Sequence, residues 1–183
     1  MIRHAFALVM MATPAFAQDT GLATWSKIHE VFSHPRCVYC HVGPDNVPIV
    51  SLSEDRANPL PHGMKANGGK SRKGAETILC TACHTKHNSP LLHGAPGAPV
   101  WWLPPVAMQW FGKSSAEICT QIKDREGKRN RSIAEIADFI VIEELIHWGW
   151  EPGPGREPAP YSWPQLVEFI KQWDAAGAPC PTQ

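Results

Sequence analysis

Two copies of one five-residue pattern, C-x-x-C-H, constrain this chain more than any other feature. They occupy residues 37–41 (CVYCH) and 80–84 (CTACH). The pattern is the attachment signature of c-type haem: two thiols on one helical turn bind one porphyrin, and the adjacent histidine supplies an imidazole nitrogen to the iron. The sequence therefore predicts two covalently bound haem c groups. The predicted thioether residues are Cys37, Cys40, Cys80 and Cys83, and the predicted proximal iron ligands are His41 and His84.

Two other kinds of site also use C-x-x-C pairs. Four thiolates from two such pairs hold structural zinc ions, and a single pair serves in thioredoxin-type redox centres. Neither needs a histidine after the second cysteine, and histidine is only 9 of the 183 residues, so its presence at both positions favours haem. Zinc–thiolate sites are also unusual in exported proteins, where thiols oxidise.

The N-terminus has the features of an export signal. A weakly basic start precedes an apolar run over residues 5–11, and Ala-Phe-Ala at 15–17 matches a small-x-small cleavage site. We expect residues 1–17 to be a signal peptide and residues 18–183 to form one mature domain in the periplasm. Because no other stretch approaches the roughly 20 apolar residues of a membrane helix, no membrane span is expected.

The remaining cysteines, Cys119 and Cys180, are expected to pair as a disulfide in that oxidising compartment. The bond would hold the C-terminal tail against the body of the protein. Closing a loop of about 60 residues is worth roughly 4 kcal/mol of unfolding free energy in the chain-entropy model. The alternative is two unpaired thiols.

Periodicity and capping motifs predict a mainly α, loop-rich fold of the small multihaem cytochrome type. Residues 41–79 and 84–108 lack periodicity, and loops of that length are uncommon in a compact domain unless something other than side chains fills the core. Two haems wrapped by the chain would do so. We expect the haem-binding part at about 22–110 and a helical C-terminal part at about 111–183. Four helices are predicted, at 24–32, 114–123, 132–147 and 162–176.

The second axial ligand of each iron decides much of a haem's function. His62 is the first candidate, because it lies in a loop framed by Pro and Gly between the two motifs. Met108, between aromatic residues in a Pro-rich segment, would give a His/Met haem, although a core methionine is an equally good interpretation. His34 is too close to the first motif to turn over that iron, but would reach the other haem. The remaining candidates are His29, His87, His93, His147 and Met64.

Net charge excludes one class of partner. The chain has 17 Lys and Arg against 17 Asp and Glu, so it lacks the basic field that nucleic-acid binding needs. No nucleic-acid partner is expected.

Five segments carry a resemblance to a known group of proteins: His34 to His41, Cys80 to His84, Trp102 to Trp110, Trp148 to Arg156 and Gly177 to Pro181. They resemble a group of small proteobacterial c-type cytochromes often labelled isoquinoline 1-oxidoreductase subunit. The resemblance covers most of the mature chain and implies redox protein partners, such as a periplasmic molybdenum hydroxylase or a terminal electron acceptor.

Together these features predict a periplasmic diheme cytochrome c that passes electrons between a redox enzyme and another carrier, without being an enzyme itself. The alternative is a small haem enzyme, such as a peroxidase or a sulfur-compound oxidase, with one open coordination site. The sequence shows no group of acid and base residues for such a site. A haem-based sensor would need a signalling domain that the sequence does not contain.

Overall fold

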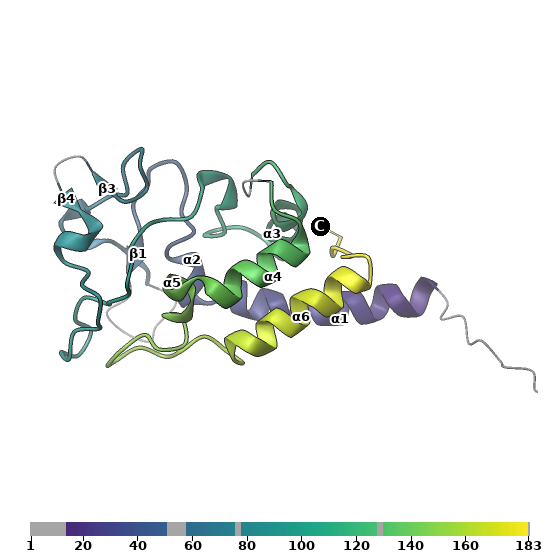
Figure 1. Ribbon diagram of the computed structural model, residues 1–183. Coiled ribbons are helices and arrows are strands. Elements are labelled where there is room, and N and C mark those ends of the chain that lie inside the picture. Colours follow the sequence, from purple (N-terminus) through teal and green to yellow (C-terminus); the bar gives the residue numbers. More distant parts are fainter. Residues whose placement is uncertain (1–13, 51–57, 76–77, 128–129, 183) are drawn as a thin grey trace, which may run out of the picture.

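The computed structural model describes residues 14–50, 58–75, 78–127 and 130–182, and it shows helices at one end and loops at the other (Figure 1). The prediction of a mainly α chain is confirmed. The α-helices are α1 (Pro14–Phe32), α2 (Pro35–Val38), α3 (Ser115–Lys123), α4 (Ile133–Ile142), α5 (Glu144–His147) and α6 (Trp163–Ala175). The 3₁₀ turns are η1 (Gly63–Lys65), η2 (Cys80–Ala82) and η3 (Val106–Met108).

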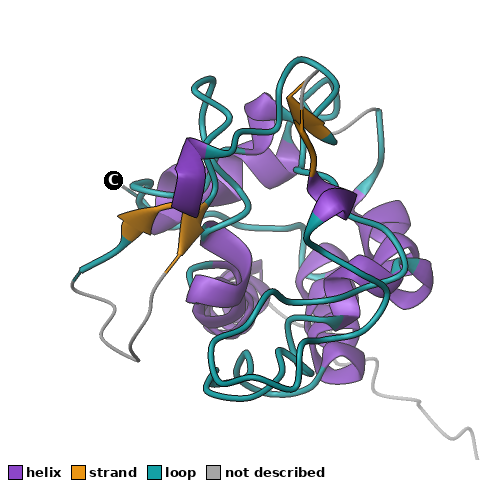
Figure 2. Ribbon diagram, turned by 90° about the vertical axis from the view of Figure 1, so that its left-hand side faces the viewer, coloured by secondary structure: helices purple, strands orange, loops and turns teal. Residues whose placement is uncertain are grey.

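Four two-residue strands form two antiparallel pairs within the loop-rich end, and Figure 2 shows the pairs on opposite sides of it. β1 (Ile49–Val50) pairs with β2 (Leu60–Pro61), and β3 (Gly74–Ala75) pairs with β4 (Ile78–Leu79). The sequence predicts no strand ladder. Strands this short are too brief for an alternating apolar pattern to reveal them.

The hydrophobic core lies between the helices. Helix α6 runs antiparallel to α1 and packs against both α1 and α4 (Figure 1). Trp25 of α1 and Trp173 of α6 are almost fully buried, and their ring centres lie 4.8 Å apart. Each helix contributes apolar side chains at helical spacing, which gives one face to the core. The fully buried side chains include Ile28, Ile118, Ile122, Leu166 and Ile170.

Three of the predicted helix starts are confirmed. Ser114 and Ser132 each accept a hydrogen bond from the backbone N–H three residues on, and the glutamate there bonds back to the serine N–H, which completes a capping box. Ser162 caps α6 through the N–H of Gln165. These side chains satisfy N–H groups that a helix start otherwise leaves without partners.

Two predicted helix boundaries are wrong. Helix α1 begins at Pro14 rather than Thr24, because the Thr24 hydroxyl donates to the Thr20 carbonyl inside the helix instead of capping it. The helix predicted over 132–147 is divided at Glu143, whose backbone is extended (φ −92°, ψ 99°). Its carboxylate accepts the N–H of Leu145, so Glu143 ends α4 and caps α5.

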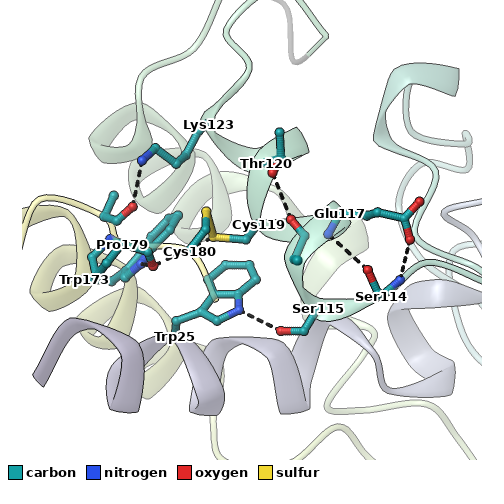
Figure 3. Close-up of a disulfide and its surroundings, with 12 residues drawn as sticks. Trp25, Ser114, Ser115, Glu117, Cys119, Thr120, Lys123, Trp173, Pro179 and Cys180 are labelled. Atoms are coloured by element: carbon teal, nitrogen blue, oxygen red, sulfur yellow. Dashed lines mark hydrogen bonds between the residues drawn. A yellow bond between two sulfur atoms is a disulfide. The ribbon is translucent and has the colours of Figure 1, made fainter. Parts of the chain in front are cut away.

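The predicted Cys119–Cys180 disulfide is confirmed, and it joins α3 to the C-terminal tail (Figure 3). Two hydrogen bonds hold the same tail. The indole Nε1 of Trp173 donates to the Pro179 carbonyl at 2.9 Å, and Lys123 Nζ donates to the Ala178 carbonyl at 2.9 Å. The tail is therefore part of the helical body.

The described residues contain no helix long and apolar enough to cross a membrane. Residues 1–13 of the predicted signal peptide lie outside the described ranges.

Candidate functional site

Both C-x-x-C-H motifs adopt the same helical turn. In the first motif, the backbone N–H groups of Cys40 and His41 donate to the carbonyl of Cys37. In the second, the corresponding groups of Cys83 and His84 donate to the carbonyl of Cys80, in the same pattern. The first turn continues α2 and the second is η2. The two motifs, which share no flanking sequence, therefore present their thiols and histidine in equivalent ways.

The two motif histidines are also oriented in the same way. Nδ1 of His41 lies 2.8 Å from the carbonyl oxygen of Met108, and Nδ1 of His84 lies 2.9 Å from that of Pro96. Because a carbonyl oxygen only accepts, each Nδ1 must carry the proton. The neutral ring then has its free lone pair on Nε2, which is the arrangement that metal-binding histidines use.

One tryptophan flanks each of these rings. The Trp110 indole stacks on the His41 imidazole with ring centres 3.4 Å apart and planes 6° apart. Trp101 lies 4.2 Å from His84, at a tilt of 39°. Residues 96–110 thus supply both carbonyl acceptors and both flanking rings, which fixes the orientation of the two imidazoles from one segment.

Each motif lines its own cavity. Cys37, Cys40 and His41 line one, which we call the His41 cavity, and its empty space measures about 1120 Å³ with the open mouth included. The other, the His84 cavity, measures about 1160 Å³ on the same basis. The second cavity is lined by Cys40, Cys80, Cys83 and His84, among others.

The two cavities share a wall. Five residues line both, so a single layer of side chains separates them. The indole of Trp101 contacts that of Trp148 edge-on, with ring centres 5.8 Å apart, and the Arg36 guanidinium lies 5.7 Å from the Trp148 ring centre. The five residues are Arg36, Cys40, Trp101, Trp102 and Trp148.

His62, the first candidate for a second axial ligand, faces His84 across the His84 cavity. The two ring centres lie 5.8 Å apart with planes at 49°. Nδ1 of His62 donates to the Gly63 carbonyl at 2.9 Å, so its Nε2 also keeps a free lone pair. One metal ion between two imidazoles holds their centres roughly 6 Å apart, because metal–nitrogen bonds are about 2 Å long and the nitrogen lies about 1 Å from the ring centre.

His34 and Met108, the next two candidates, are placed differently from His62. His34 is almost fully buried as the N-cap of α2, where its Nδ1 accepts the N–H of Arg36, and it lines neither cavity. Met108 does line the His41 cavity. Its backbone carbonyl, however, holds Nδ1 of His41, so its backbone lies at the edge of the ring opposite to the free Nε2.

Burial keeps the side chains of Cys37, Cys40 and His41 neutral. It lowers the pKa of His41 to about 3, against the opposing effect of the Met108 hydrogen bond, and the free lone pair on Nε2 persists at neutral pH. Burial raises the pKa of Cys37 to about 12 and that of Cys40 to about 11. Redox-active C-x-x-C pairs have a lowered thiol pKa instead, so these thiols do not resemble a thioredoxin-type centre.

The surroundings of both cavities offer groups that suit a large apolar molecule with acidic edges. The indole N–H groups of Trp101 and Trp110 are buried without a partner in the described part of the chain. Met64, Ile78 and Leu79 line the His84 cavity and yet are 86%, 45% and 56% exposed. Unpaired buried donors and exposed apolar side chains are both unfavourable in a protein alone. A porphyrin would cover the apolar side chains, and its carboxylates would accept hydrogen bonds from the donors.

The geometry gives no support to the zinc alternative. Within the described ranges, no three His, Cys, Asp or Glu side chains come together as a metal site. All four motif cysteines are free thiols. A zinc–thiolate site would need them to converge on one point.

Comparisons with family models, with curated proteins and with solved structures find no match to this chain.

Sequence reasoning missed the supports of the two motif histidines. The acceptors are main-chain carbonyls of Pro96 and Met108, and no residue type identifies a carbonyl that will accept such a bond. The one available signal was the concentration of Pro and Trp over residues 96–110, which predicts a rigid segment but not its partners.

Proposed function

We propose that the chain is an exported c-type cytochrome with two covalent haems that transfers electrons between redox proteins in the periplasm. The observation that carries the proposal is the duplicated arrangement of the two motif histidines. In each copy a carbonyl fixes the proton on Nδ1 and leaves Nε2 free, and the motif residues line a cavity of their own.

The thiols would each form a thioether with a porphyrin, two per haem. His41 and His84 would bind iron through Nε2, and the hydrogen bonds at Nδ1 would set the ring orientation and raise its basicity as a ligand. A bound haem supplies one-electron chemistry whose potential depends on the axial ligands and on burial. The chain's own contribution is to position the haems, to orient the histidine ligands and to exclude water from around the iron.

His62 is proposed as the second ligand at the His84 cavity. The 5.8 Å between the rings of His62 and His84 is close to what one ion shared by two imidazoles needs. Two histidine ligands would give that iron a closed coordination sphere, which favours electron transfer over substrate binding.

The shared wall supports transfer within the molecule. Cys40 lines both cavities although it belongs to the first motif, and Trp101 flanks His84 while lining both. An electron passing between the two centres would therefore cross a single layer of side chains. Trp101 Nε1 and Arg36 are also placed to donate to porphyrin carboxylates at this wall.

The test is a count of covalent haem. The chain is expressed with a c-type haem maturation system, and haem per chain is measured by the pyridine haemochrome spectrum and by intact mass. We expect two haems in the unmodified protein and one in the C80S/C83S variant. A redox titration should resolve two one-electron steps in the unmodified protein.

The matched control is the C119S/C180S variant, which also removes two cysteines but should keep both haems. A protein without covalent haem would contradict the proposal. So would zinc that metal analysis finds in the unmodified protein and that is lost when the four motif cysteines are replaced.

A further inference from the structure

The two cavities differ in what faces the motif histidine. His62 faces His84 across the His84 cavity. In the His41 cavity, the described lining contains no histidine other than His41 and no methionine other than Met108. The cavities differ only in the candidate for the second axial ligand, because the motif histidine is presented in the same way in both cavities.

Met108 is held on the wrong side of His41 to complete that centre. Its carbonyl accepts the proton of Nδ1, and an iron would be bound at Nε2 on the opposite edge of the ring. The imidazole, the iron and the porphyrin plane would all separate the Met108 backbone from the open face. Its thioether therefore cannot reach the sixth position without breaking the hydrogen bond that orients His41.

The other polar residues around the His41 cavity do not replace it. Arg36 and Arg131 have no free lone pair at any ordinary pH. The Glu143 carboxylate accepts the N–H of Leu145 at 3.3 Å and so caps α5. The rest of the wall is mostly apolar, with Trp102, Phe139, Ile140, Leu145 and Ile146 among its residues.

We propose that His41 is the sole protein ligand of its iron and that the cavity across from it binds a neutral diatomic molecule such as carbon monoxide or nitric oxide. This inference rests on the proposed function, since it needs a haem at the first motif. Binding adds one lone pair to the sixth position and breaks no bond to the protein. The wall across from His41 is mostly apolar and suits a small uncharged ligand.

The experiment titrates the dithionite-reduced holoprotein with carbon monoxide and measures bound gas per chain, with the haem count checked on the same sample. We expect one carbon monoxide per two haems. Before reduction, electron paramagnetic resonance should show one high-spin and one low-spin ferric centre. The H62A variant should bind two molecules per chain. The matched control is H87A, an exposed histidine that lines neither cavity, which should bind one.

The outcomes separate this inference from the proposed function. Two low-spin haems that bind no carbon monoxide would overturn the inference and leave the diheme proposal intact. If the M108L variant then bound one molecule, Met108 would be the ligand. A protein without haem would remove the proposed function itself. Two molecules bound by the unmodified protein would keep the open site at His41 and exclude His62 as a ligand.

Discussion

The walls of the two cavities come from different kinds of structure. The His41 cavity is lined by side chains from all six α-helices, several of which belong to the hydrophobic core, such as Ile122, Ile140 and Leu166. The His84 cavity is lined mainly by loops, by β1 and β4 and by the turns η1 and η2. The helical core can exist without a cofactor, because its side chains already bury one another.

The loop-rich wall has no such independent support. Its strands have two residues each, and Met64, Ile78 and Leu79 remain exposed around the cavity that they line. Two-stranded pairs are marginally stable on their own. Under the proposed function, one haem site would be built largely by protein packing, and the other would depend on the bound haem to bury its apolar residues.

The largest expected effect comes from removing both haems. In the C37S/C40S/C80S/C83S variant, amides of α1 and α6 should keep their protection against hydrogen exchange. The amides of His62 and Leu103, which bond to the carbonyls of Pro48 and Arg72, should lose essentially all of their protection and exchange as in an unfolded chain. The measurement is hydrogen exchange followed by mass spectrometry or NMR.

The control for that experiment is the unmodified holoprotein under the same conditions. If the helical amides exchange as fast as the loop amides in the haem-free variant, the helical core is not independent and the contrast between the two regions is wrong.

A smaller effect, confined to the helical region, should follow loss of the disulfide. The bond spans 61 residues, so the C119S/C180S variant should lose roughly 4 kcal/mol of unfolding free energy in the chain-entropy model. The measurement is denaturant unfolding followed by circular dichroism. The haem spectra should not change, because neither cysteine lines a cavity. A spectral change at either haem would show that the two regions are not separable in this way.

The smallest effect should come from one helix cap. Ser114→Ala removes the capping box of α3, which should lower the unfolding free energy by about 1 kcal/mol and leave the haem spectra unchanged. Ser26→Ala, at an exposed position within α1, is the matched control and should stay within about 0.5 kcal/mol of the unmodified protein. Equal effects from the two variants would mean that the cap contributes nothing measurable.

The features that could be predicted from the sequence are those with a local chemical signature. Ser114 and Ser132 predict helix starts, because a capping box depends on residues three positions apart. The Cys119–Cys180 disulfide could be predicted because these two cysteines remain once the four cysteines of the C-x-x-C-H motifs are set aside. The two C-x-x-C-H motifs are likewise visible in the residue order alone.

The features that could not be predicted depend on contacts between distant segments. Glu143 interrupts a run with continuous helical periodicity, and only the backbone shows that it caps a second helix. Met108 is a plausible ligand by residue type. Its main-chain carbonyl, however, binds Nδ1 of His41, 67 residues earlier in the chain, on the edge of the ring opposite to Nε2. The facing of His62 and His84 likewise depends on how two loops fold together.

The position of the disulfide bears on how the protein matures. If the chain is exported as proposed, its six cysteines can pair in many ways, and four of them would have to stay reduced for haem attachment. The helical core brings α3 and the tail together through Trp173 and Lys123 (Figure 3). A chain that folds its helices first would withdraw Cys119 and Cys180 from thiol–disulfide exchange with the motif cysteines. Folding order would then decide which thiols are oxidised and which wait for a porphyrin.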